Sequence, residues 1–256
     1  MDMNRRKMIK ITGAALAGAA LLNNTAIAQD NSAEKSNNAK KKKALFIGAH
    51  PDDPETACGG TMVLLREAGY DVVSVYMTRG EAGIVGKTHA EASAIRTQEA
   101  ENACKILGAR AIFMTQLDGS SEVNKERYVE MRTLFKDEAP DIVFTHWPID
   151  SHPDHRVCSL LVYDAWRRLG YNFELFYFEV MSGTQTQLFQ PTDYVDISKV
   201  AQIKKDACYC HESQDMLHLY KDWHDGMEHF RGLESRCERA EAFNHLKSTG
   251  NGINES

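Results

Sequence analysis

The chain has 256 residues, of which 43% are hydrophobic and 26% are charged. That length and composition fit one large globular domain with a substantial core, and they exclude a chain that is disordered throughout. The formal net charge of −6 argues against nucleic acid as a partner.

The first 28 residues have the pattern of an export signal. Arg5 and Arg6 precede an apolar, small-residue run over 11–22, and residues 26–28 suit a cleavage site. The paired arginines resemble a twin-arginine signal, which exports folded proteins. An apolar run of about a dozen residues is short of the roughly 20 that span a bilayer, so we expect no stable membrane insertion after processing. An uncleaved anchor is the alternative.

We expect four segments along the chain: a signal peptide (1–28), a flexible polar leader (29–42), one domain (43–247) and a frayed tail (248–256). Export predicts a periplasmic location. Cleavage would remove four basic residues and one acidic residue, so the formal charge would change from −6 to −9. The six cysteines form no CxxC pair, and we expect most of them to be small buried hydrophobes. A homo-oligomer is left open.

Strand-length apolar runs alternate with helical periods from Lys43 onward. The predicted strands are 45–49, 71–77, 111–114, 142–145 and 175–178, and the predicted helices are 61–68, 89–107, 125–138 and 154–169. An edge strand over 194–197, a helix to about His211 and a last helix over 234–246 follow. This alternation predicts an α/β fold, a single Rossmann-like domain with a mostly parallel sheet and helices on both faces.

Imidazoles and carboxylates follow the first and fourth predicted strands, in the segments 49–55 and 145–155. Ligands of such sheets bind at the carboxyl ends of the strands, so both segments can face one cleft. A catalytic zinc needs three protein ligands and one open position, and His50, Asp53 and His155 supply that set. Only one of two adjacent carboxylates can take the same metal position, which leaves the other free to act as a base. Simple turns, or a helix cap at 154–155, are the alternatives.

These segments, together with Gly59-Gly60-Thr61, resemble the two signature motifs of the LmbE-like (PIG-L) zinc deacetylases, which remove acetyl groups from N-acetylglucosamine-type substrates. The resemblance implies that Zn2+ is bound by His50, Asp53 and His155. It also implies that Asp52 is the general base, that His152 stabilises the oxyanion and protonates the leaving amine, and that Asp154 orients a histidine.

Further segments, 78–83, 96–100, 211–214 and 240–243, resemble the same family. By that resemblance Arg96 and Glu81 contact the substrate, and a guanidinium can bind sugar hydroxyls or an anionic group through two hydrogen bonds. The alternative for Arg96 is an arginine on a helix surface. His146 directly follows a strand, and we expect it to pack or to support the site, not to bind metal.

The expected reaction is hydrolysis of the acetamide of an N-acetylated amino sugar or glycoconjugate, with release of acetate. Two alternatives stay open: a zinc amidase for another N-acyl amine, and a non-catalytic periplasmic sugar-binding protein on the same fold. Neither a GxGxxG or GxxxxGK[ST] phosphate loop nor a GxSxG nucleophile turn occurs.

Overall fold

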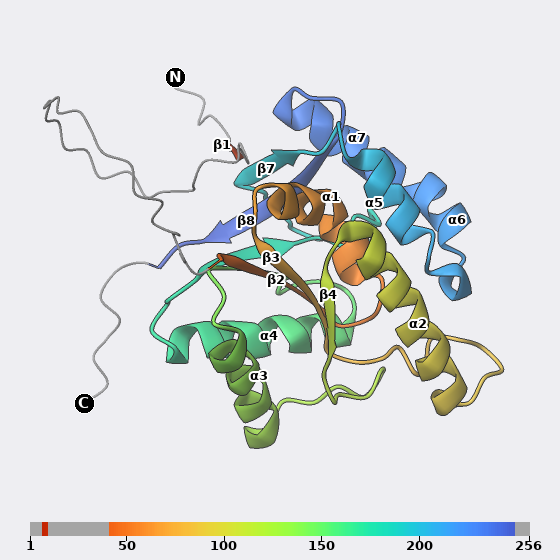
Figure 1. The fold of residues 1–256 in the computed structure, drawn as a ribbon, viewed down its shortest axis with the longest axis vertical. Coiled ribbons are helices and arrows are strands. Elements are labelled where there is room, and N and C mark those ends of the chain that lie inside the picture. The colour runs from red at the N-terminus through yellow and green to blue at the C-terminus, as the bar shows by residue number, and fades with distance from the viewer. Residues whose placement is uncertain (1–6, 10–40, 249–256) are drawn as a thin grey trace, which may run out of the picture.

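A computed structural model describes residues 7–9 and 41–248 (Figure 1). A single sheet of eight strands lies at its centre, in the spatial order β1-β7-β8-β6-β5-β2-β3-β4. The strands are β1 (Lys7–Ile9), β2 (Lys43–Gly48), β3 (Asp71–Tyr76), β4 (Arg110–Phe113), β5 (Ile142–His146), β6 (Glu174–Phe178), β7 (Asp193–Asp196) and β8 (Ala240–Leu246). The α-helices are α1 (Asp53–Glu67), α2 (His89–Leu107), α3 (Lys125–Glu138), α4 (Pro153–Arg168), α5 (Ala201–Cys208), α6 (Met216–Leu219) and α7 (Asp225–Ser235).

The sheet is parallel except at β8. Strands β2 to β6 pair with their neighbours in parallel, whereas β8 is antiparallel to both β6 and β7. Residues 7–9 add β1 in parallel to β7. The prediction of a mostly parallel α/β sheet is therefore confirmed.

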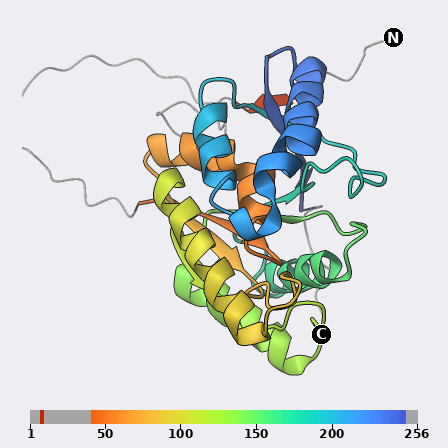
Figure 2. The ribbon, with the colours of Figure 1, turned by 90° about the vertical axis from the view of Figure 1, so that its right-hand side faces the viewer.

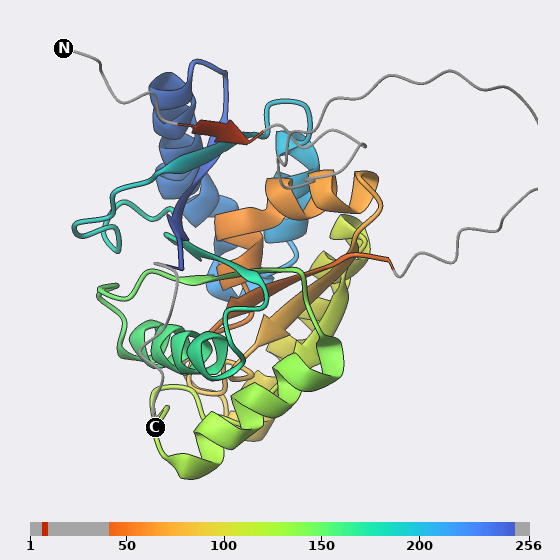
Figure 3. The same cartoon turned by 90° about the vertical axis from the view of Figure 1, so that its left-hand side faces the viewer.

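Two layers of helices bury the two faces of the sheet. In β2, Ala44 and Phe46 pack in one apolar core with residues of α1, α2 and α5. Leu45 and Ile47 pack in a second core with residues of α3 and α4, because successive strand side chains point to opposite faces. Figure 3 shows α3 and α4 (green) on the side of the sheet opposite to α1 (orange), and α5 packs on α1 and α2 (Figure 2).

The first helix begins earlier than predicted. It was expected over 61–68, but α1 starts at Asp53, directly after the first signature residues. Gly59 and Gly60 lie inside this helix, at positions where neighbouring side chains leave no room for a Cβ. A Cβ on Gly60 would lie 2.5 Å from Ile197 Cγ2, and one on Gly59 would lie 2.8 Å from Lys204 Cγ. Because α1 begins at Asp53, this residue lies in a helical turn and not in a loop.

The predicted last helix over 234–246 is wrong. Helix α7 ends at Ser235, since Arg236 has a left-handed backbone with φ 67°, and Ala240–Leu246 is strand β8. The segment alternates with a period of two: Phe243 joins the core with α1, while Ala240 and Ala242 join a separate cluster. Hydrogen bonding to both β6 and β7 outweighs the local helix preference of its alanines and glutamate.

The prediction for the cysteines is confirmed, because all six are free and four of them are buried. The predicted signal, leader and tail lie outside the described residues, apart from 7–9, 41–42 and 248. Among the described helices, none has the length and apolar character of a membrane span.

Candidate metal centre and active site

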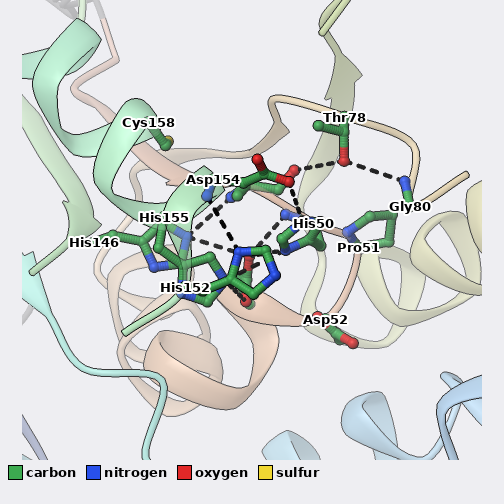
Figure 4. Close-up of polar contacts among 12 residues, drawn as sticks. His50, Pro51, Asp52, Thr78, Gly80, His146, His152, Asp154, His155 and Cys158 are labelled. Carbon is green, nitrogen blue, oxygen red and sulfur yellow. Dashed lines mark hydrogen bonds and ion pairs between the residues drawn. The ribbon is translucent and has the colours of Figure 1, made fainter. Parts of the chain in front are cut away.

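The two signature segments meet because β2 and β5 are paired neighbours that run in the same direction. His50 follows β2, Asp53 is the first residue of α1, and His155 lies in the first turn of α4. All three side chains are at least nine-tenths buried. Figure 4 shows the imidazoles of His50 and His155 turned toward each other at this edge of the sheet.

His50 Nδ1, His155 Nε2 and the Asp53 carboxylate, which faces one imidazole with each oxygen, lie at nearly equal distances from one another and form the triangle of the site. His50 Nδ1 lies 3.4 Å from Asp53 Oδ2, His155 Nε2 lies 3.3 Å from Asp53 Oδ1, and the two ring nitrogens lie 3.3 Å apart. A tetrahedral zinc with ligand bonds of about 2.0–2.1 Å has ligand-to-ligand edges of about 3.3–3.4 Å. The spacing of these groups therefore matches that of zinc ligands, with an Asp53 oxygen as the third donor, and leaves a fourth position open.

Each imidazole has a carboxylate next to the ring nitrogen that faces away from the triangle. His50 Nε2 lies 3.0 Å from Asp118 Oδ1 and 3.2 Å from Asp154 Oδ2. When a metal replaces the second ring proton, Nε2 would carry the remaining proton and Nδ1 would offer its lone pair. His155 Nδ1 lies 3.0 Å from Asp150 Oδ2, although the two groups are not well aligned for a hydrogen bond. Carboxylates in this position commonly orient metal-binding histidines.

The electrostatics of the site favour a bound cation. Burial opposes ionisation of His50, but hydrogen bonds to Asp118, Asp154 and Asp53 outweigh it and hold the pKa of His50 well above its usual value. For His155 burial is likewise outweighed, chiefly by Asp53, and its pKa is raised to about 9. The same carboxylates would attract a metal ion in place of these protons.

His146 is close to the triangle but is not available as a ligand. Its Nε2 lies 3.2 Å from Asp53 Oδ2, and Asp53, His146 and His155 have ligand atoms within 4.8 Å of one another. However, the backbone N–H of Ala49 donates to this same Nε2 at 2.9 Å. The lone pair that a metal would need is therefore already used. Burial and the positive His155 lower the pKa of His146 to about 4, so its ring is neutral.

His152 stands beside the triangle with one ring nitrogen free. It is the N-cap of α4, and its Nδ1 accepts the backbone N–H of Asp154 at 3.2 Å. Burial and the charges of His50 and His155 lower the pKa of His152, which favours the neutral ring. Because Nδ1 is the acceptor, the proton of the neutral ring is on Nε2, which can donate to an oxygen. Its ring centroid lies 4.8 Å from that of His50.

Asp52 precedes α1 with an unusual backbone and an ionic partner. Its φ is 115°, which costs about 1–3 kcal/mol for a residue other than glycine. Its Oδ2 accepts a hydrogen bond from Arg96 Nη2 at 3.0 Å, and Figure 4 shows its side chain apart from the imidazole cluster. Burial raises the pKa of Asp52 to about 6, and Arg96 limits that rise.

The remaining predicted residues lie around this cluster. Arg96 is only 3% exposed and also donates to the carbonyl of Pro51 at 2.6 Å, so it contacts the signature segment itself. Its role as a substrate contact stays a prediction. Glu81 accepts the N–H groups of Arg79 and Asp118, each at 3.2 Å. Asp154 Oδ2 lies 3.2 Å from His50 Nε2, so His50 is the histidine that it would orient, and this role stays a prediction.

Sequence reasoning did not single out the two further carboxylates, Asp118 and Asp150. Asp150 lies within the second signature segment, and Asp118 follows the strand β4 by five residues. Acidic residues shortly after each strand of a parallel sheet are the signal that could have found both.

The fold and the site define the class: a parallel α/β domain with a buried His-His-Asp site at the carboxyl ends of two adjacent strands. The family model of the GlcNAc-PI de-N-acetylases (PIG-L) matches residues 45–166. A diacetylchitobiose deacetylase of Thermococcus kodakarensis is 33% identical over 71% of this chain and 73% of its own length. The chain belongs to the PIG-L family and is a hydrolase of its N-deacetylase class.

Two further relatives differ in the reaction for which they are named. The structure of N,N'-diacetylchitobiose deacetylase from Pyrococcus horikoshii, solved with an inhibitor, superimposes with a TM-score of 0.72 at 25% identity, over 81% of this chain and 84% of the other. A 4-oxalmesaconate hydratase of Pseudomonas putida is 26% identical over 73% of this chain and 80% of its own length. The relatives of this chain therefore include both deacetylases and an enzyme named as a hydratase.

Proposed function

We propose that this protein removes the N-acetyl group from an N-acetylglucosamine-type amino sugar or glycoconjugate, with zinc as its metal, after export to the periplasm. The observation that carries the proposal is the triangle of His50 Nδ1, Asp53 and His155 Nε2, with edges of 3.3–3.4 Å. A sugar-binding protein without catalytic activity would have no use for three convergent metal donors.

The donor set supports zinc. Two imidazole nitrogens and one carboxylate oxygen, with one position left open, are a common catalytic zinc set, although other divalent metals bind similar donors in vitro. When bound, zinc supplies Lewis-acid polarisation of a carbonyl and lowers the pKa of bound water to about 7.

The residues of the chain supply the proton transfers of the hydrolysis. Asp52 accepts a proton from the water that attacks the acetamide carbonyl carbon. The Nε2–H of His152 donates to the carbonyl oxygen as it becomes negative. The C–N bond then breaks, and the proton that Asp52 took from water passes to the nitrogen, which leaves as an amine, while the neutral His152 keeps its Nε2 proton on the oxyanion side. One water is consumed, and the products are acetate and the free amino sugar.

The substrate class is supported by the relatives. Both the Thermococcus and the Pyrococcus proteins are named for the deacetylation of diacetylchitobiose. The proposal is therefore an acetamido sugar, free or within a larger glycoconjugate. The relative named as a 4-oxalmesaconate hydratase suggests the principal competing reaction, addition of water to a substrate.

The export proposal rests on the pattern of residues 5–28. Expression of the full chain in a bacterium with and without a functional twin-arginine system, followed by cell fractionation, tests it. We expect a periplasmic protein that begins at Gln29 only in the strain with the system. A protein that stays in the cytoplasm of both strains would contradict export.

The function is tested with residues 29–256, loaded with one equivalent of zinc, on a panel of N-acetylglucosamine, diacetylchitobiose, N-acetyl amino acids and an unsaturated dicarboxylate. We expect acetate release from the acetamido sugars alone, and its loss in Asp52→Asn. Turnover of N-acetyl amino acids alone would contradict the proposed substrate class. Hydration of the dicarboxylate would contradict the proposed reaction. Sugar binding without turnover would contradict the enzyme.

A further inference from the structure

The backbone at Asp52 needs a restraint. Its φ of 115° is one that L-residues rarely adopt, and it lies between Pro51 and the proposed metal ligand Asp53. A change of φ here would swing the Asp52 side chain away from its present position and would disturb the start of α1. Some contact must therefore outweigh the preference of this residue for a negative φ.

Glu55 makes that contact from the first turn of α1. Its side chain is fully buried, and its Oε2 accepts the backbone N–H of Asp52 at 3.2 Å. This bond exists only while the Asp52 N–H points back into the helix end. Arg96 holds the same turn from the other side, through the carbonyl of Pro51 at 2.6 Å and the carboxylate of Asp52 at 3.0 Å.

The Glu55 carboxylate is itself held by a different element. Its Oε1 accepts the hydroxyl of Tyr76 in a short hydrogen bond and lies 3.5 Å from Ser74 Oγ, both of which are on β3. On the other side, Nε2 of the buried His211 lies 3.6 Å from Oε2. The restraint on Asp52 is therefore anchored to the sheet and does not depend on α1 alone.

We propose that Glu55 is a positioning residue, which holds Asp52 in its left-handed backbone and thereby places the carboxylate that takes the proton from water. The inference rests on the proposed function for its catalytic consequence, but its structural part does not. Glu55 contacts the backbone of Asp52, and we assign it no contact with substrate or metal.

Three variants, each loaded with one equivalent of zinc, separate positioning from simple packing. Glu55→Met keeps the volume and helix preference but removes the acceptor for the Asp52 N–H. Glu55→Gln keeps an acceptor oxygen. Tyr76→Phe removes one partner of Oε1 but leaves Ser74, His211 and the Asp52 N–H beside the carboxylate, so it is the matched control.

In Glu55→Met we expect kcat for acetate release to fall by about 10- to 100-fold, since a misplacement of about 1 Å can cost about 100-fold. KM and zinc content should stay within about twofold. Glu55→Gln should recover most of kcat, and Tyr76→Phe should lower the Tm without a comparable loss of kcat. In zinc-loaded crystals of Glu55→Met, the φ of Asp52 should become negative and its carboxylate should leave Arg96.

An unchanged kcat in Glu55→Met, or an Asp52 φ that stays positive in its crystal structure, would overturn the proposal. So would a kcat in Glu55→Gln as low as that of Glu55→Met, because charge and not position would then matter. If Glu55→Met does not fold, Glu55→Asp, which withdraws the acceptor by one methylene, decides by the same two measurements. A wild-type protein that releases no acetate would contradict the proposed function, whereas the crystallographic result would still decide the positioning.

Discussion

Two clusters of buried charged side chains can be compared, and they differ in whether the protein itself satisfies their donors and acceptors. In the metal triangle of His50, Asp53 and His155, lone pairs of three residues converge on one point. In the second group, the ion network of Lys204, Glu228 and Glu241, Lys204 Nζ lies 3.0 Å from Glu228 Oε1 and 2.8 Å from Glu241 Oε1. All three side chains of the network are fully buried.

The ion network is saturated within the protein. Glu241 also accepts the backbone N–H groups of Gly60 and Thr61 at 2.9 and 2.8 Å, and Glu228 accepts the hydroxyl of Tyr220 at 2.5 Å. These bonds tie β8 to the middle of α1, and α7 to Tyr220. Donors and acceptors that satisfy one another indicate a structural role, whereas two imidazole nitrogens and a carboxylate turned toward one another indicate a metal site. The comparison predicts which variants lose metal and which lose stability.

The largest effect is expected at the triangle. Asp53→Asn keeps the shape of the side chain but removes the negative charge that a metal needs. We expect it to retain less than about a tenth of an equivalent of zinc and to lose at least about 1000-fold in kcat/KM, which is about 4 kcal/mol of transition-state stabilisation. Metal analysis and acetate release check this. Asp137→Asn, the same change on the exposed face of α3, should alter neither.

Disruption of the ion network should lower the free energy of unfolding and leave zinc binding unchanged. Lys204→Met leaves two buried carboxylates without their cation, which typically costs about 3–5 kcal/mol of unfolding free energy. Unfolding in urea, monitored by circular dichroism, measures this loss, and the folded protein should still bind one zinc. Arg168→Met removes a pair whose arginine is 64% exposed and should cost less than about 1 kcal/mol. Equal stability of Lys204→Met and wild type would refute the structural assignment.

A smaller effect is expected at His152, which we assign to chemistry and not to metal binding. His152→Asn keeps an oxygen that can cap α4 but removes the Nε2–H donor. We expect kcat to fall by about 100- to 1000-fold, the usual loss for one oxyanion donor, with about one zinc retained. Loss of zinc in this variant would instead place His152 among the ligands.

The smallest effect is expected for Asp154, which contacts His50 on the side away from the triangle. Asp154→Asn weakens the carboxylate that orients His50, so zinc affinity should fall by about 10- to 100-fold. Competition with a fluorescent chelator measures the affinity. Glu122→Gln, which alters a carboxylate that is 59% exposed, serves as the control. An unchanged affinity in Asp154→Asn would mean that Asp118 alone orients His50.

The fold was largely predictable because its strands are continuous apolar runs. Helices over 89–107 and 125–138 have the predicted bounds, since Gly108 with its φ of 70° and Ala139 with its φ of 45° end them locally. Strand β8 was not predictable, because its partners β6 and β7 come from elsewhere in the chain and decide its conformation.

For the site, sequence spacing indicated the strand-end side chains that the structure brings together. It did not indicate the backing carboxylates Asp118 and Asp150, the blocked Nε2 of His146, or the partner of Arg96. Each of these depends on which atoms meet across separate elements. The ion network was missed for the same reason, since Lys204 and Glu241 lie on α5 and β8.

The central claim is tested most directly by anomalous X-ray scattering at the zinc absorption edge, from crystals of the protein loaded with one equivalent of zinc. The account predicts a single peak about 2.0–2.2 Å from His50 Nδ1, an Asp53 carboxylate oxygen and His155 Nε2. A peak bound by His146, or by the opposite nitrogen of His50 together with Asp118, would contradict it.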